Sequence, residues 1–168
     1  MDKILLYFGC PLTDKSEEYR QEIRDFKSLA RRRFPEIEIL EFCGMTEGTP
    51  WDVYEQDINR GVARARGILA IWDGASSGLG FEEGIGIGRF FKPCLNVSPR
   101  GSKISRLIQG IEPHHNYCRA AEYVDKCTDL LETIGLWLKD LPMLAVLANE
   151  ARRQHFLKEK AYFEPLSR

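Results

Sequence analysis

Two short, uninterrupted apolar runs constrain the fold of this 168-residue chain more than any other feature. Residues 4–8 run into a glycine, and residues 68–72 run into a loop that is rich in glycine and serine. Runs of this length suit strands, because buried helices usually need more residues. A strand that is apolar on both sides is typical of a parallel sheet covered by helices on both faces. We therefore expect an α/β protein.

The segments around these two runs continue the alternation of strands and helices. Two further strands are expected at residues 37–42 and 93–97. Helical patterns are expected between Tyr19 and Pro35, over residues 52–66 and over residues 81–91. Strands that alternate with helices predict a flavodoxin-like, doubly wound parallel sheet, here of four or five strands.

The last third of the chain is predicted to be helical. Apolar residues recur there at steps of three and four, which predicts an amphipathic helix through Ala120, Val124, Cys127, Leu131, Ile134 and Leu138. Residues 142–162 form a second helical stretch. We expect residues 1–140 to form one domain and residues 141–168 to form a helical C-terminal extension of that domain.

The charge balance argues against nucleic acid or an anionic membrane as the main partner. Lys and Arg total 24, Asp and Glu total 25, and the formal net charge is -1. No apolar stretch approaches the roughly 20 residues that span a bilayer, and the first apolar run is too short for a signal peptide. The five cysteines form no C-x-x-C pair, which favours reduced thiols over disulfides or a zinc site. We expect a cytoplasmic protein.

Three loops are expected at the carboxyl ends of strands, where doubly wound sheets bind their ligands. They cover residues 9–16, 43–49 and 73–80. The candidate chemistry should therefore be found in or beside these loops.

Glu82 is the first candidate catalytic residue, because it follows the glycine-rich turn with Gly78 and Gly80. Glycines let the backbone approach a ligand closely, so both are candidate binding residues. Glu82 is expected in the first helical turn, where the helix dipole and free N–H groups favour a charged carboxylate. A glycosidic nucleophile must be ionised. The alternative is that Glu82 or Glu83 only complements the helix dipole.

Asp57 is the second candidate catalytic residue. It is three residues from Tyr54 and four from Gly61, so all three share one face of the expected helix. A carboxyl held near Glu82 in a dry pocket would have a raised pKa and would suit a general acid. The alternative is an exposed helix carboxylate.

The stretch from Gly78 to Gly84 resembles the G-x-G-x-E-x-G signature of the nucleoside 2-deoxyribosyltransferase family. That family includes the related 2'-deoxynucleoside 5'-phosphate N-hydrolases. The resemblance covers about residues 3–110. It implies that Glu82 rather than Glu83 is the nucleophile, and that Asp57 protonates the leaving base.

The same resemblance implies roles for several binding residues. Tyr7 and Gly9 resemble the N-terminal strand and loop that lie against the base. Ser76 matches a serine with which the hydrolase branch contacts phosphate. Ser105 resembles a serine that the hydrolases donate across a subunit interface.

The resemblance implies cleavage of the N-glycosidic bond of 2'-deoxynucleosides through a covalent deoxyribosyl-glutamate intermediate. Transfer of the 2-deoxyribosyl group to another base ranks first, because Pro11, Leu12 and Thr13 stand where the hydrolases carry a serine and an arginine for phosphate. Hydrolysis of 2'-deoxynucleoside 5'-monophosphates is an alternative that Ser76 and Ser105 support. A third hypothesis is a non-catalytic nucleotide-binding module whose C-terminal helices recruit a partner.

The partners implied by the resemblance are a small-molecule nucleoside or nucleotide and further copies of the chain. It implies a homo-oligomer whose subunits share active sites. It implies no metal and no cofactor.

Overall fold

Five strands form one sheet in the computed structural model of this chain, which describes residues 3–40 and 49–163. They are β1 (Ile4–Gly9), β2 (Ile37–Ile39), β3 (Gly67–Ile71), β4 (Cys94–Pro99) and β5 (Cys118–Tyr123). The strands pair in the order β2-β1-β3-β4-β5, and every neighbouring pair is parallel. This is the order of a flavodoxin-like, doubly wound sheet, so the predicted fold class is confirmed with five strands.

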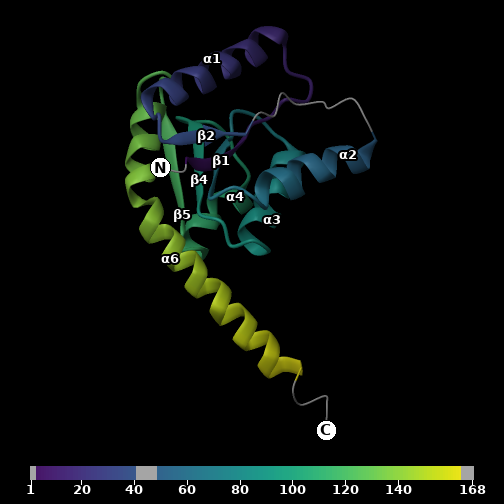
Figure 1. The fold of residues 1–168 in the computed structure, drawn as a ribbon. Coiled ribbons are helices and arrows are strands. Elements are labelled where there is room, and N and C mark those ends of the chain that lie inside the picture. Colours follow the sequence, from purple (N-terminus) through teal and green to yellow (C-terminus); the bar gives the residue numbers. More distant parts are fainter. Residues whose placement is uncertain (1–2, 41–48, 164–168) are drawn as a thin grey trace.

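Helices cover the sheet and connect its strands (Figure 1). They are α1 (Glu17–Arg33), α2 (Pro50–Tyr54), η1 (Glu55–Val62), α3 (Ser77–Gly88), α4 (Arg106–Gln109), α5 (Ile111–His114) and α6 (Asp129–Phe163). Adjacent residues of β1 show how the two faces divide, because they point to opposite sides of the sheet. The Phe8 ring packs against Phe26 of α1, with ring centroids 5.9 Å apart. Tyr7 lies on the other face, beside Glu82 of α3.

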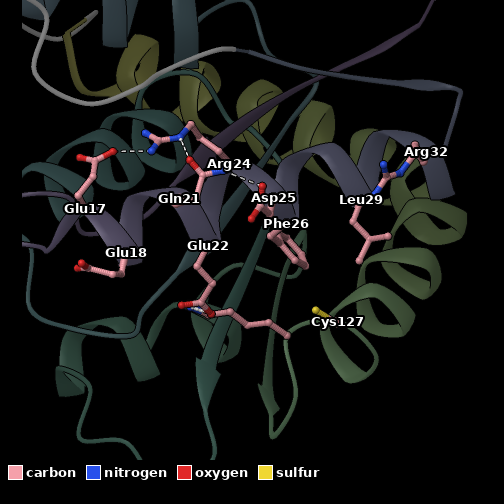
Figure 2. Close-up of a pocket in the computed structure, with 11 residues that line it drawn as sticks. Glu17, Glu18, Gln21, Glu22, Arg24, Asp25, Phe26, Leu29, Arg32 and Cys127 are labelled. Carbon is pink, nitrogen blue, oxygen red and sulfur yellow. Dashed lines mark hydrogen bonds and ion pairs between the residues drawn. The ribbon is translucent and has the colours of Figure 1, made fainter.

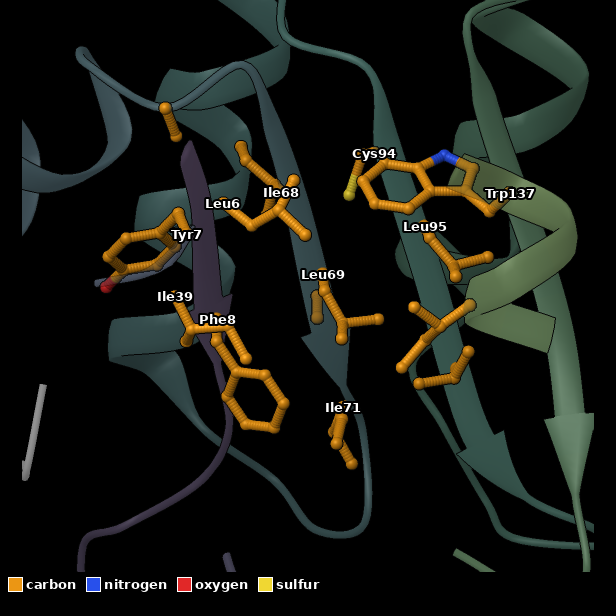
Figure 3. Packing of buried hydrophobic residues seen from close by; sticks show 14 of the residues in the cluster. Leu6, Tyr7, Phe8, Ile39, Ile68, Leu69, Ile71, Cys94, Leu95 and Trp137 are labelled. Atoms are coloured by element: carbon orange, nitrogen blue, oxygen red, sulfur yellow. The ribbon is translucent and has the colours of Figure 1, made fainter. Parts of the chain in front are cut away.

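The core lies on both faces of the central strands. Figure 3 shows side chains of β1, β3 and β4 packed together, with the Trp137 indole of α6 beside them. Leu6, Ile68 and Leu95 are each at most 2% exposed. Full burial of such a side chain stabilises the fold by about 1.5–3 kcal/mol. The apolar runs that predicted the strands therefore also supply the core.

The segment that begins the expected C-terminal amphipathic helix is a strand, so this part of the prediction was wrong. β5 pairs along its whole length with β4, from Cys94 opposite Cys118 to Pro99 opposite Tyr123. Backbone hydrogen bonding to β4 outweighs the helical spacing of the apolar residues, which included Ala120. The helix begins only at Asp129, after a turn.

Two other element boundaries differ from the expectation. β2 ends at Ile39, and residues 41–48, which hold the last two residues of the expected strand and most of the expected loop over 43–49, lie outside the described residues. α3 begins at Ser77 instead of residue 81, because the Ser76 hydroxyl caps it by accepting a hydrogen bond from the Leu79 N–H at 3.1 Å.

The two helical stretches expected at the C-terminus form one continuous helix, α6. Pro142 lies inside it, on an exposed position. The expected limit between domain and extension, at residues 140 and 141, therefore falls within a single helix. In Figure 1 the first half of α6 runs along the sheet, and its yellow second half extends away from the body.

The described ranges contain no helix with the length and apolar character needed to cross a membrane. Cys10, Cys94, Cys118 and Cys127 are free thiols.

Replacing Gly67 with alanine is expected to destabilise the fold, because α6 packs directly on the start of β3. A Cβ atom at Gly67 would lie 2.7 Å from Cη2 of Trp137 and 3.2 Å from Cδ1 of Leu141. Overpacking of this kind should lower the free energy of unfolding by about 1–3 kcal/mol, measured by urea denaturation. Trp137→Phe removes the clashing ring atoms, so the double variant should lose less than the sum of the single losses. Additive losses would contradict this packing.

Candidate active site

Glu82 of α3 lies between two glycines at the carboxyl end of β1. A Cβ atom placed on Gly9 would lie 3.7 Å from Glu82 Oε2, and one placed on Gly78 would lie 3.9 Å from Glu82 Oε1. The same atom on Gly9 would overlap Cδ1 of Leu79, so only glycine lets α3 approach the end of β1 this closely. Since neither glycine has a side chain, neither covers the carboxylate oxygens.

The Tyr7 hydroxyl donates a hydrogen bond to the Glu82 carboxylate. Burial, and next to it the charge of Glu82, raises the pKa of Tyr7, so the phenol remains a protonated donor. Burial also raises the pKa of Glu82, the charge of Asp57 raises it further, and the hydrogen bond from Tyr7 lowers it. Tyr7 therefore supports the ionised form of a carboxylate that its surroundings desolvate.

Asp57 belongs to the same group of side chains, because its charge acts on both Glu82 and Tyr7. It lies on η1, a π-helix in which the Ala63 N–H donates to the Ile58 carbonyl oxygen at 2.8 Å. The expected α-helix over residues 52–66 is therefore replaced by α2 and the wider π-helix. π-Helical turns within helices are frequent at functional sites. Asp57 is half-buried, and burial raises its pKa.

Glu83 points away from Glu82 and has a structural role. It is 1% exposed. Its carboxyl accepts a hydrogen bond from Trp72 Nε1 at 3.2 Å and one from Cys94 Sγ at 3.6 Å. These donors lie on or beside β3 and β4, so they hold α3 against the sheet. The structure thus separates the two adjacent glutamates, one toward β1 and one into the core.

The prediction that Glu82 lies in the first helical turn, where the helix dipole favours its charged form, was wrong. Because α3 begins at Ser77, Glu82 is its sixth residue and lies beyond the first turn. The dipole acts mainly within the first turn. Burial is the largest effect on the Glu82 pKa and acts in the opposite direction, leaving the Tyr7 hydrogen bond as the interaction that favours the charged form.

The two serines of the expected site both cap helices. Ser76 lies beside the glycine-rich turn at the start of α3, and the Cβ position of Gly78 is 3.9 Å from its hydroxyl oxygen. Ser105 accepts a hydrogen bond from the Leu107 N–H at 3.2 Å, at the exposed start of α4. Gly80 contacts a different part of the molecule, because its Cβ position is 3.7 Å from Cη2 of Trp72. The structure brings together Tyr7, Gly9, Asp57, Gly78 and Glu82, with Ser76 next to them.

A polar network that we did not predict joins the first loop to the loop after β3. The Tyr19 hydroxyl donates to both carboxylate oxygens of Asp73, at 2.7 and 2.8 Å. Lys126 Nζ lies 3.1 Å from Asp73 Oδ2, and Lys15 donates to the Asp73 carbonyl oxygen at 3.4 Å. The sequence signal that could have indicated this network is the position of Asp73 soon after a buried strand. This network fixes the loop from which α3 and Glu82 begin.

A groove lined mostly by charged residues lies elsewhere in the molecule. Figure 2 shows a cavity of about 810 Å³ along α1, on the opposite face of the sheet from Glu82. Its charged side chains pair with one another, as Arg24 does with Glu17 and Lys126 with Glu22. A helix face whose charged side chains form ion pairs with one another is typical of a solvated surface.

Within residues 3–40 and 49–163, no three His, Cys, Asp or Glu side chains are grouped to hold a metal ion. The side chains gathered near Gly9 are instead two carboxyls and one phenol.

Neither the protein-family models nor the curated proteins include a match to this chain. Among solved structures, the fold is similar to that of the CMP N-glycosidase BcmB of Clostridium botulinum, with a TM-score of 0.60. The two are 15% identical, over 79% of this chain and 98% of that chain. A likeness at this identity shows a shared fold.

Replacing Tyr7 with phenylalanine is expected to raise the pKa of Glu82 further, because the variant lacks the hydroxyl that stabilises the charged form. Carbon-13 NMR titration of the glutamate side-chain carboxyls measures this change. Glu82→Gln identifies the resonance, and Tyr117→Phe, a buried tyrosine elsewhere, is the control. An unchanged or lowered Glu82 pKa in Tyr7→Phe would contradict the hydrogen bond.

Proposed function

We propose that this chain is an enzyme that cleaves the N-glycosidic bond between a nucleobase and a pentose, with Glu82 as its nucleophile. One observation carries the proposal. Glu82, Tyr7 and Asp57 gather at the carboxyl end of β1, next to the switch point where doubly wound sheets bind ligands. The solved structure of similar fold is by its name a CMP N-glycosidase, which supports the same class of reaction here.

In the first step, the ionised Glu82 carboxylate attacks the anomeric carbon of the sugar. The bond from this carbon to the base nitrogen breaks, and its electron pair leaves with the base. Asp57, whose pKa is raised by burial, donates the proton that neutralises the leaving base. The products are the free base and a glycosyl ester of Glu82.

In the second step, an acceptor attacks the same carbon from the face that the base has left, and Glu82 leaves as a carboxylate. The Asp57 carboxylate accepts the proton that the acceptor loses. A nitrogen of a second base gives transfer, and water gives hydrolysis. Both displacements invert the anomeric carbon, so the whole reaction retains its configuration.

We rank transfer of a 2-deoxyribosyl group between bases first, on the basis of the sequence resemblance. Hydrolysis of a nucleoside 5'-monophosphate is the second candidate, and the name of the structural neighbour favours it, because CMP is a monophosphate. CMP carries ribose, so the preference for a 2'-deoxy sugar rests on the resemblance alone.

Two adjacent isosteric variants test the role of Glu82. Glu82→Gln removes the nucleophile and should lower kcat by about a thousandfold or more. Glu83→Gln keeps a hydrogen-bond acceptor in the buried network and is the matched control, with a loss of less than about tenfold. Chromatography of the free base released from deoxynucleosides and from their monophosphates measures kcat for both variants. Equal losses in the two variants would contradict the assignment of Glu82.

Exchange of bases separates the two candidate reactions. If the enzyme is a transferase, a deoxynucleoside should exchange its base only when a second free base is present. If it is a hydrolase, a monophosphate should release its base and pentose 5-phosphate in buffer alone. No turnover of either substrate by the parent protein, together with nucleotide binding that survives Glu82→Ala, would favour a non-catalytic binding module.

A further inference from the structure

A cavity of about 550 Å³ lies over β4 and β5, on the side of α3 away from Glu82. Glu82 faces the end of β1 beside Gly9, whereas the cavity is lined by Trp72 and by residues of the two later strands. Ile104 and Ile108, from the loop after β4 and from α4, give it an apolar wall. A volume of this size is typical of sites for small molecules. The cavity can therefore hold a ligand apart from the candidate active site.

The strand residues that line the cavity are arranged in two rows. Asn96 lies opposite Ala120, and Ser98 lies opposite Glu122. Alternate residues of a strand point to the same face, so these four side chains share one face of the sheet. The second row lies about 7 Å closer to the carboxyl edge than the first. Arg100 follows β4 at that edge and also lines the cavity, which thus runs from an amide to a guanidinium.

Asn96, in the first row, has a donor that the chain does not use. It is 4% exposed, and its Oδ1 accepts a hydrogen bond from Trp72 Nε1 at 3.1 Å. An indole N–H can only donate, so this bond fixes which atom of the amide is the oxygen. Among the described residues, neither Asn96 Nδ2 nor the buried Ser102 hydroxyl of the same cavity has a hydrogen-bond partner. Buried polar atoms are nearly always paired, and acceptor atoms of a ligand would pair these two.

The two charged residues of the cavity suit different parts of a ligand. In the part of the chain that the structure describes, only Arg100 and Glu122 among the lining residues are charged. An arginine binds phosphate with two parallel hydrogen bonds, although the charge of Arg100 here also acts on Asp129 of α6. An acidic side chain accepts hydrogen bonds from pentose hydroxyls in dinucleotide sites. An amide beside apolar groups, then a carboxylate, then a guanidinium is the order that matches base, pentose and phosphate.

We propose that this cavity binds a nucleoside 5'-monophosphate, at a second site separate from that of Glu82. The base lies over Ala120 and against the two isoleucines, and one of its carbonyl oxygens accepts a hydrogen bond from Asn96 Nδ2. The pentose hydroxyls donate to Glu122, and the phosphate accepts hydrogen bonds from Arg100 and Ser102. The site does not depend on the proposed reaction, because binding here makes and breaks no covalent bond.

The proposed ligand contacts the hydrogen bonds that hold α3 on the sheet. The Trp72 indole N–H donates both to Asn96 Oδ1, at 3.1 Å, and to Glu83 Oε2, at 3.2 Å. A ligand that restrains the Asn96 amide also restrains this indole. Nucleotide binding in the cavity therefore stabilises the orientation of α3 that directs Glu82 toward β1.

Titration of the Glu82→Gln protein with uridine 5'-monophosphate, followed by carbon-13 methyl NMR, tests the proposal. This nucleotide has two carbonyl oxygens on its base, and the variant prevents its consumption. The methyl resonances of Ile104 and Ile108 should shift and give one dissociation constant. Ile58, next to Asp57 in the chain, reports separately on the candidate active site. Shifts at Ile58 alone would overturn the proposal and leave the proposed function standing, whereas cavity binding without any turnover by the parent protein would do the reverse.

Two variants locate the ligand within the cavity. Ala120→Leu fills the exposed floor beside Asn96 and should raise the dissociation constant about tenfold or more. Arg100→Gln should weaken binding of the monophosphate about tenfold or more but leave that of uridine unchanged, because only the former has a phosphate. Arg100→Gln also provides the answer if Ala120→Leu does not fold. Ala145→Leu, at a half-buried position of α6 outside the cavity, is the matched control and should change neither affinity.

Three results would overturn the proposal. The first is no shift of the Ile104 and Ile108 methyl resonances at millimolar nucleotide. The second is binding that Ala120→Leu leaves unchanged or that Ala145→Leu weakens as much. The third is an Arg100→Gln variant that loses the same affinity for uridine as for its monophosphate, or none for either.

Discussion

The buried hydrogen bonds of Glu83 set the direction of Glu82, and the candidate site depends on that direction. α3 contains five glycines, so its own helix propensity is weak, and contacts with the sheet must fix its rotation. Trp72, directly after β3, and Cys94 of β4 donate hydrogen bonds to the Glu83 carboxyl. The preceding side chain along the helix, Glu82, then points about 100° away, toward β1 and its tyrosine. Two adjacent glutamates of equal chemistry thus acquire different roles from their neighbours.

Burial of the Glu82 and Asp57 carboxyls destabilises the folded chain when they are ionised. Burial raises the pKa values of Glu82 and Asp57 in the folded chain above those in the unfolded chain. Their contribution to stability is therefore fully present below the unfolded-state pKa and is lost as the pH rises through the folded-state values. Near neutral pH the desolvated carboxylates oppose folding, and the hydrogen bond from Tyr7 offsets part of this. A desolvated carboxylate is also more reactive as a nucleophile, which is the benefit that the proposed function requires.

The sequence predicted the fold class well because its information was local. Apolar runs identified β1 and β3, and glycine-rich turns identified the edge of the sheet where Glu82, Gly9 and Gly78 meet. The errors arose where partners distant in the sequence decide the structure. β5 is a strand because β4 supplies its hydrogen bonds, although its apolar spacing is helical. The π-helix that carries Asp57 and the network around Asp73 also depend on tertiary contacts, which residue spacing does not encode.

The formation of a covalent bond between Glu82 and a sugar is the central claim, and trapping that bond tests it most directly. A 2'-fluoro nucleoside or nucleotide analogue slows the release of a glycosyl intermediate, so mass spectrometry of the intact protein should show the mass of one added sugar. Peptide mapping should locate this mass on Glu82, and Glu82→Gln should remain unmodified. Turnover of the natural substrate with no adduct on Glu82, or with an adduct on another residue, would contradict the account.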